Sequence, residues 1–435
     1  MKNTEKLYLG VAREIITPPI GTYLGGYGVE GRNAVSINDD LTVTALSFRR
    51  GDVRTMLISA TIVVVDENIC WQIRRKIEEE TGILAENIMF HATHTHSAPV
   101  SFTSMGWGEP DHEYVDGILI PKSILAAKRA SENEVYVRMG HGEGESLVGV
   151  CRREPSRINN GVKLGCWKYG CFDPKMTVLS FVGEDGACVA NIVHYACHPT
   201  ASGVNLEVSR DWPGVMIDRL EEYSGGITAY FNGPEGDIGP RLDTGKTTGE
   251  NHVKYALRHG ELAARDAIAI YETISEYRDV ELKCAARDVR LPLEPRVPYE
   301  EAKRLMNPEA DYAAYVERQK EYYAAVVESY ERGEEELEYR EHLQTAVRIG
   351  DVAFVGHPFE TFSEIGLRIN VMSEIPTVLS LPIVNGVQCY LPTKGEIPRG
   401  GYEVKMFKTY GLQRYTEDTD FALINESLKT LEELK

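Results

Sequence analysis

The sequence lacks the long apolar run that a membrane-spanning helix requires, since no segment approaches about 18 consecutive apolar residues. The N-terminal stretch 1–6 has no apolar region behind it, so we expect neither a signal peptide nor a membrane span. None of the eight cysteines forms a CxxC pair, and Cys166 and Cys171, with four residues between them, are only a weak signal for zinc or a disulfide. Scattered cysteines in a chain of this size are typical of a reducing compartment, and we predict a cytoplasmic location.

Basic residues are scarce relative to acidic ones. Lys and Arg number 47 against 66 Asp and Glu, which gives a formal net charge of -19. Nucleic acids and anionic membrane surfaces are bound through basic surfaces, so this balance argues against both as main partners and leaves a small molecule as the expected one. The sequence also lacks internal repeats, low-complexity tracts and a phosphate-binding glycine motif, and it gives no indication of the oligomeric state.

The chain of 435 residues has the composition of an ordinary globular protein, with 43% hydrophobic and 26% charged residues. Strand patterns mixed with helical patterns indicate an α/β (α+β) fold with a sheet-rich core and flanking helices. We expect one catalytic domain over 1–435, in which a helical segment at 299–343 precedes a possible C-terminal subdomain at 345–435. The other elements that periodicity and turn residues predict are hairpins at 41–65, 176–194 and 345–355, and helices at 67–81, 114–132, 209–223 and 251–275.

Three histidines fall within six residues at the end of a predicted strand, in the stretch 90–99. In an extended segment, residues two apart point to the same face, so we expect His94 and His96 to share a face and His91 to lie on the other. One imidazole of such a pair can bind a metal ion while the other reaches only the water on that ion. The alternative is a histidine-rich strand end without a metal.

Further candidates lie at other strand ends. His194 and His198 follow a strand-like pattern, which keeps them apart, so His198 is the better ligand candidate and His194 is typical of a core histidine. The loop after the strand at 228–231 carries Glu235 and Asp237, and loops at strand ends are common places for a site. Glu360 lies at a strand-to-helix junction, where the alternative is a first-turn acid that interacts favourably with the helix dipole.

Two features could contact a substrate. Trp107 lies between two glycines just after the histidine stretch, where it could flank a substrate or pack in the interior. Arg152 and Arg153 stand side by side in an acidic protein and could bind an anionic group, although a surface salt-bridge pair is the alternative.

The order of these motifs resembles the catalytic domain of the neutral (alkaline, non-lysosomal) ceramidases, which are zinc-dependent amidases. The resemblance covers most of the chain, and the run 93–97, Thr-His-Thr-His-Ser, is its most specific part. Here Ala98, Cys151 and Phe359 replace residues usual in the family, and we expect no C-terminal β-sandwich. The other matching segments, in chain order, are 10–12, 16–19, 151–152, 198–200, 236–240, 358–360, 390–393 and 402–403.

Carried over residue by residue, the resemblance implies a Zn²⁺ ion with four protein ligands, which are His94, His198, Glu360 and Tyr390. It also implies that His96 is an acid/base or supporting group and that Arg152 and Tyr402 polarise the reacting carbonyl. Two imidazoles and a carboxylate are a common catalytic zinc set, whereas a tyrosine ligand is unusual. Asp237, Arg153 and Trp107 are the expected substrate-binding residues.

The predicted function is therefore a zinc-dependent hydrolase that cleaves an amide (N-acyl) bond with metal-activated water. The substrate is a ceramide-type lipid or a smaller soluble N-acyl compound. Two alternatives stay open. One is a metal-dependent lyase or deacetylase acting on an acidic or N-acetylated sugar, and the other is a non-catalytic binding protein with the same fold.

Overall fold

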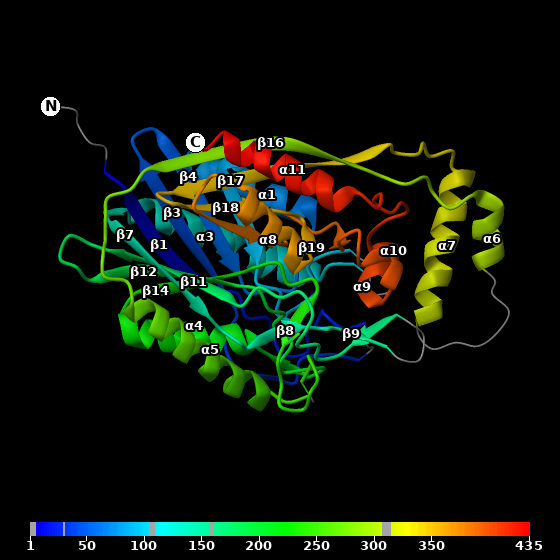
Figure 1. Ribbon diagram of the computed structural model, residues 1–435, viewed down its shortest axis with the longest axis horizontal. Helices are drawn as coiled ribbons and strands as arrows, with labels where there is room; N and C mark the ends of the chain where they lie inside the picture. Colours follow the sequence, from blue (N-terminus) through cyan, green and yellow to red (C-terminus); the bar gives the residue numbers. More distant parts are fainter. Residues whose placement is uncertain (1–5, 29–30, 104–108, 157–160, 250, 307–314) are drawn as a thin grey trace.

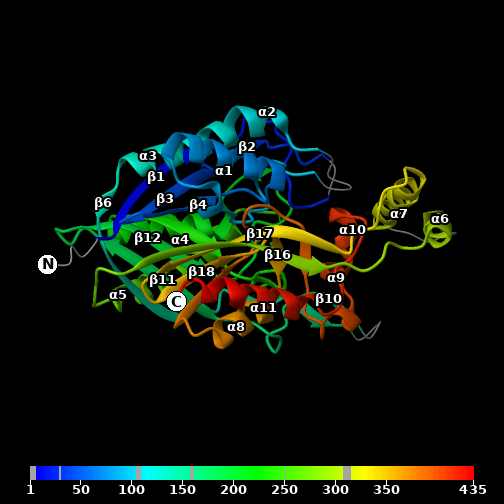
Figure 2. The same cartoon turned by 90° about the horizontal axis from the view of Figure 1, so that it is seen from above.

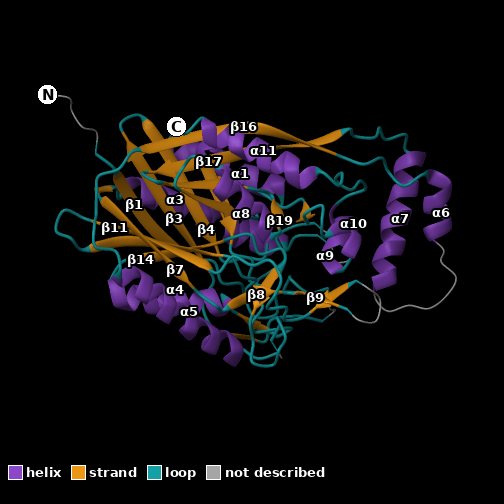
Figure 3. Ribbon diagram, in the orientation of Figure 1, coloured by secondary structure: helices purple, strands orange, loops and turns teal. Residues whose placement is uncertain are grey.

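The computed structural model describes residues 6–28, 31–103, 109–156, 161–249, 251–306 and 315–435. Three sheets form its interior and helices cover their outer faces (Figure 1, Figure 3). The sheets have the strand orders β5-β4-β3-β1-β6, β14-β12-β11-β7 and β16-β17-β18-β20. Within the described chain, no helix has both the length and the apolar character needed to cross a membrane.

The three sheets are built from the same succession of elements. Each begins with a strand, continues with a β-hairpin antiparallel to it, and adds a crossover helix, a strand parallel to the second hairpin strand, and a further helix. The sequence shows no repeat because this hydrogen-bonding pattern demands only apolar periodicity and turns, not particular side chains.

Each such succession of elements is one repeat of the fold. The first consists of β1 (Tyr8–Ile15), β3 (Thr42–Arg50), β4 (Val53–Ala60), α1 (Glu67–Thr81), β5 (Ile88–Ala92) and α3 (Ile120–Glu132). The second consists of β7 (Arg138–Glu145), β11 (Lys175–Val182), β12 (Cys188–Tyr195), α4 (Asp211–Ser224), β14 (Ile227–Asn232) and α5 (Lys254–Glu272). The third consists of β16 (Leu282–Pro292), β17 (Tyr339–Ile349), β18 (Val352–Gly356), α8 (Ser363–Met372), β20 (Thr377–Leu381) and α11 (Thr419–Glu432).

Shorter elements complete the described chain. The strands are β2 (Ser36–Ile37), β6 (Val135–Tyr136), β8 (Gly149–Cys151), β9 (Arg153–Pro155), β10 (Val162–Leu164), β13 (Glu207–Val208), β15 (Ile238–Pro240), β19 (Phe359–Thr361) and β21 (Cys389–Leu391). The helices are α2 (His112–Tyr114), α6 (Tyr299–Met306), α7 (Tyr315–Glu331), α9 (Tyr402–Lys405) and α10 (Phe407–Tyr410), with a π turn at Val115–Leu119 and 3₁₀ turns at Ala85–Asn87 and Ile397–Arg399.

Local sequence signals explain the boundaries of the first repeat. Gly51, with φ of 56°, makes the hairpin turn between β3 and β4. Asp66 caps α1 by accepting a hydrogen bond from the Asn68 N–H, and Gly82, with φ of 70°, ends the helix. The predicted hairpin at 41–65 and helix at 67–81 are confirmed on this part of the chain.

The predicted helical segment at 299–343 is wrong at its C-terminal end. Helices α6 and α7 lie within it, but β17 begins at Tyr339 and pairs with β16 along its whole length. Its charged residues suggested a solvated helix, and the ladder with β16 overrides that local preference. Both views place α6 and α7 away from the sheets, at the end where α9 and α10 lie (Figure 2).

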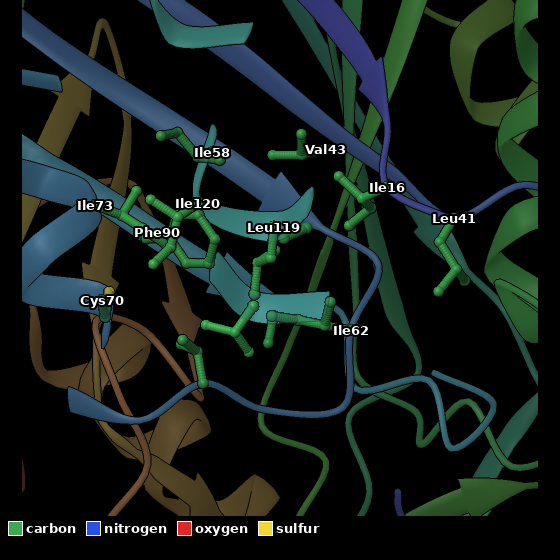
Figure 4. Packing of buried hydrophobic residues seen from close by; sticks show 14 of the residues in the cluster. Ile16, Leu41, Val43, Ile58, Ile62, Cys70, Ile73, Phe90, Leu119 and Ile120 are labelled. Atoms are coloured by element: carbon green, nitrogen blue, oxygen red, sulfur yellow. The ribbon is translucent and has the colours of Figure 1, made fainter. Parts of the chain in front are cut away.

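The apolar core forms between each sheet and its helices and also among the sheets. One cluster fills the space between the first sheet and helices α1 and α3 (Figure 4). A central cluster joins side chains from all three sheets, with Phe48, Phe181 and Phe354 contributed by one sheet each. Two further clusters lie under α4 with α5 and under α8 with α11. Burial of these aliphatic and aromatic side chains, at about 1.5–3 kcal/mol each, holds the three repeats together.

One edge of each sheet carries the loops that matter for function. Because β1 is antiparallel to β3 and β3 to β4, the strands β1, β4 and β5 all end at the same edge, and the corresponding strands of the other repeats do likewise. The long segments 16–41, 146–174 and 293–338, which separate the first and second strands of the repeats, also start there. The candidate site lies where these three edges meet.

Candidate metal centre

His94 owes its position to a left-handed backbone, not to strand alternation. The strand β5 ends at Ala92, and His94 has φ of 74°, a conformation that non-glycine residues rarely adopt. Its Nδ1 lies 2.7 Å from the Val63 carbonyl, which leaves Nε2 to face the site. The prediction attributed the proximity of His94 and His96 to an extended strand, and that cause is wrong. The two imidazoles do meet, with their Nε2 atoms 3.3 Å apart.

His198 enters from the second repeat, in the loop after β12. It is fully buried, and its Nδ1 lies 2.7 Å from the Glu235 carbonyl and 2.9 Å from that of Ile238. A carbonyl on one imidazole nitrogen fixes the tautomer and turns the other nitrogen toward a metal. Burial, aided by Arg152, lowers the pKa of His198 to about 3, so the imidazole is neutral as a ligand must be. His194 instead lies 3.1 Å from the Ser380 carbonyl in the core.

Glu360 enters from the third repeat, in β19, just before α8 begins at Ser363. Its Oε2 lies 3.2 Å from the Nε2 of His94 and 3.2 Å from the Nε2 of His198. Burial alone would raise the pKa of Glu360, but the two imidazoles, His94 first, hold it well below its usual value. Each of the three repeats thus gives one potential ligand.

These separations fit a metal ion. Two ligand atoms bound at about 2.1 Å in a tetrahedral arrangement lie about 3.4 Å apart. Among the described residues, two buried groups could hold a metal ion, because the ligand atoms within each group lie within 4.8 Å of one another. The first group is His94, His96 and His198, and the second is His94, Glu235 and Glu360. Glu360 Oε2 is buried and has no hydrogen-bond partner in the described chain, which is the expected state of an oxygen that faces an ion.

Tyr390 and Arg152 border this group. The Tyr390 hydroxyl lies 3.4 Å from the Nε2 of His198 and accepts a hydrogen bond of 3.1 Å from Arg152 Nη2. Burial raises the pKa of Tyr390 well above its ordinary value, so its hydroxyl keeps its proton without a cation beside it. The Nε of Arg152 donates to Glu403, at 3.0 Å. Tyr390 therefore lies within reach of an ion held by the histidines.

Arg153 and Asp237 are not brought to the group of ligands. Arg153 donates to Glu403 at 2.6 Å and to Glu396 at 2.8 Å, and it is only 2% exposed. The Asp237 carboxylate accepts from the backbone N–H and the hydroxyl of Ser363, at 2.7 and 3.1 Å. Trp107 lies outside the described residues. Their assignment to substrate stays a prediction.

The glycine-rich loop 16–41 supports His96. Gly26 has φ of 96°, and a Cβ there would lie 2.6 Å from the Cβ of His96. Tyr27 packs edge-on against the His96 ring, with centroids 4.7 Å apart. The absence of a side chain at Gly26 therefore allows the loop to approach a histidine of the site closely.

Two comparisons with known proteins agree on one family, although no protein-family model matches the chain. Neutral ceramidase of Pseudomonas aeruginosa is 29% identical over 178 residues, which is 37% of this chain and 26% of that protein. Neutral ceramidase A of Dictyostelium discoideum is 23% identical over 253 residues, or 52% of this chain and 35% of that protein. The crystal structure of the Pseudomonas enzyme superposes with a TM-score of 0.75 at 18% identity, covering 99% of this chain and 74% of that one.

The chain is similar in sequence to neutral ceramidases and shares their fold. A second solved structure, a ceramidase complexed with C2, superposes with a TM-score of 0.76 at 17% identity and confirms the α/β fold. The sequence matches span about a quarter and about a third of the two curated relatives, well under two thirds of their length. The resemblance to neutral ceramidases that the motifs predicted is confirmed, while the roles of the individual residues stay predictions.

Sequence reasoning ranked some site residues below their importance. It noticed Glu235 but chose Asp237 two positions away. The structure places a carboxylate oxygen of Glu235 within 4.8 Å of ligand atoms of His94 and Glu360. It missed Tyr410, whose hydroxyl hydrogen-bonds Glu360. Tyr402, on α9, stacks edge-on against Tyr390 with ring centroids 5.8 Å apart. Tyr410 lies on α10, one helix after the Tyr402-Glu403 motif on α9. No local sequence pattern marks its contact with Glu360.

Proposed function

We propose that this chain is a metal-dependent hydrolase of amide bonds, with Zn²⁺ as the ion. The observation that carries the proposal is the placement of two imidazole nitrogens, from His94 and His198, at 3.2 Å from one buried oxygen of Glu360. Two histidines and a carboxylate suit a catalytic zinc ion. The names of the matched relatives favour a ceramide-type N-acyl substrate, and a smaller soluble N-acyl compound is the second candidate.

The residues that would hold the ion are His94, His198 and Glu360, with Tyr390 at the edge of the group. A divalent metal in such a site lowers the pKa of a coordinated water towards 7 and polarises an amide carbonyl. The protein would hold the metal ligands in place before any substrate arrives. Backbone carbonyls at the Nδ1 atoms of His94 and His198 orient the imidazoles, and the hydrogen bond from Tyr410 orients Glu360.

Arg152, Tyr390 and His96 are the groups that would act on the substrate. The Tyr390 hydroxyl is held by Arg152 and can donate its proton in a hydrogen bond to the oxygen of the reacting carbonyl. His96 has a buried Nδ1 without a partner among the described residues, and burial lowers the pKa of His96 well below its usual value. A neutral imidazole can take a proton from the attacking water and pass it to the leaving amine.

The lyase alternative loses its main support. It relied on Arg152 and Arg153 as a pair that binds the carboxylate of an acidic sugar. Both guanidinium groups are buried, and each donates to a different oxygen of Glu403. The protein itself therefore provides their anion.

The direct test is metal content followed by turnover. Protein purified without chelators is expected to carry about one zinc per chain by elemental mass spectrometry, and to release free amine from an N-acyl sphingoid base or from a short N-acyl amine. Comparing the two substrates decides between them. If the protein holds no metal and takes up none when zinc is added, the hydrolase mechanism is wrong. Metal and tight substrate binding without turnover would favour the non-catalytic alternative.

His96→Ala separates ligation from proton transfer. The variant is expected to keep its metal and to lose about 10²–10⁴-fold in kcat, the usual contribution of a general acid or base. Elemental analysis and amine release measure the two properties on one sample. Loss of the metal along with activity would instead make His96 a ligand, in the group it forms with His94 and His198.

A further inference from the structure

Glu235 is a buried carboxylate that the proposed reaction does not use. It is 0% exposed, and neither of its side-chain oxygens has a hydrogen-bond partner among the residues that the structure describes. A buried, unpartnered carboxylate is unfavourable unless it takes up a proton or a cation lies beside it. In contrast, Asp237 in the same loop is fully satisfied by Ser363. Something that the protein chain does not supply is therefore expected beside Glu235.

The geometry indicates what that partner is. A carboxylate oxygen of Glu235 lies within 4.8 Å of a ligand atom of His94 and of Glu360. Two atoms bound to one ion at about 2.1 Å lie at most about 4.2 Å apart, so a shift of about half an ångström places all three on a common ion. A side chain reaches such a shift through small changes in its torsion angles.

The repeated topology gives independent support. The parallel ladders that lead into the site end at Ala92 in the first repeat and at Asn232 in the second. His94 lies two residues beyond the first ladder and Glu235 lies three residues beyond the second. Both residues therefore lie in the loop that follows the parallel ladder of their repeat, and their ligand atoms meet where the repeats join.

The charge balance is consistent with a second carboxylate. Arg152 shares the Glu403 carboxylate with Arg153, so its positive charge still acts on the centre, as the lowered pKa of His198 indicates. A divalent ion with neutral imidazoles and only Glu360 would leave one uncompensated positive charge in a buried site, which is costly. A second carboxylate removes that charge.

We propose that Glu235 is a direct ligand of the ion, so that the centre has two imidazoles and two carboxylates. The inference rests on the proposed function only in that the site binds a metal. A donor set richer in oxygen favours coordination numbers above four, and it makes the site tolerant of Mn²⁺ and Co²⁺ as well as Zn²⁺.

Cobalt substitution tests the proposal through coordination and not through activity. The protein is stripped with a chelator and reloaded with Co²⁺, whose visible bands are intense with four ligands and weak with five or six. The wild-type protein is expected to show weak bands. Glu235→Gln, which keeps the size and polarity but not the charge, is expected to show stronger bands and at least a 10-fold weaker Co²⁺ affinity. Asp243→Asn removes an exposed carboxylate, paired with Arg258, from the same segment and is the matched control, with an unchanged spectrum.

The outcomes are distinguishable. If Glu235→Gln has the wild-type spectrum and affinity, Glu235 is no ligand and only hydrogen-bonds its neighbours, while the proposed function stands. If the wild-type protein binds no metal, both proposals are wrong. Should Glu235→Gln not fold, a crystal structure of the Co²⁺-loaded wild-type protein decides the matter. A Glu235 oxygen at about 2.2 Å from the anomalous peak supports the proposal, and one beyond about 3 Å overturns it.

Discussion

Glu360→Ala is expected to lower the metal affinity by more than about 100-fold and to abolish turnover. Its Oε2 lies 3.2 Å from the Nε2 of His94 and 3.2 Å from the Nε2 of His198. Loss of a residue that only supports a ligand already costs 10–100-fold in affinity, so loss of a carboxylate ligand costs more. The measurement is metal content after dialysis, together with amine release at saturating substrate.

The matched control for Glu360 lies on the following helix. Glu364 is partly exposed and pairs with Arg368, away from the centre. Glu364→Ala is expected to keep the wild-type metal content and activity. A Glu360→Ala protein that still holds one tightly bound ion per chain would contradict the assignment of Glu360 as a ligand.

Glu403→Ala is expected to destabilise the fold by about 3–5 kcal/mol, because it removes the partner of two buried cations. One oxygen of Glu403 accepts from Arg152 at 3.0 Å and the other accepts from Arg153 at 2.6 Å. All three side chains are less than a tenth exposed. Without the carboxylate, Arg152 would carry an uncompensated charge beside the metal site. Denaturant unfolding gives the loss in free energy.

Two companion variants refine this result. Glu396 also pairs with Arg153 but is 23% exposed, so Glu396→Ala is expected to cost less than about 1 kcal/mol. Glu403→Gln keeps an acceptor for one arginine and is expected to fall between the two. If Glu403→Ala unfolds within about 1 kcal/mol of the wild-type protein, the two arginines have found other partners and the network is not a structural anchor.

The parts of the fold that were predictable from sequence are those with local signals. Gly51, Asp66 and Gly82 mark the hairpin turn and the two ends of α1, and each acts through the backbone next to it. The segment from Tyr339 to Leu343 has no such signal. Its charged residues are compatible with helix, and it becomes a strand only because β16, about 50 residues earlier in the chain, offers a ladder.

The candidate site divides in the same way. Residue types with metal chemistry, such as His94 and Glu360, could be named from the sequence and from the family resemblance. Which of Glu235 and Asp237 enters the centre could not, because Ser363 at the start of α8 takes up the Asp237 carboxylate. The left-handed backbone at His94 was equally hidden, since neighbours such as Val63 and Gly26 hold that loop in place.

The candidate ligands come from three separate repeats, and this has a consequence for synthesis of the chain. The histidines leave the ribosome first, and Tyr390 follows His198 by 192 residues. A nascent chain that contains only the first two repeats presents imidazoles without the Glu360 carboxylate, and so it is a weak and unselective chelator. An ion bound by all three repeats would be held firmly only after the third repeat has docked. Metal retention would then report completed folding, and a truncated protein is expected to exchange its ion freely.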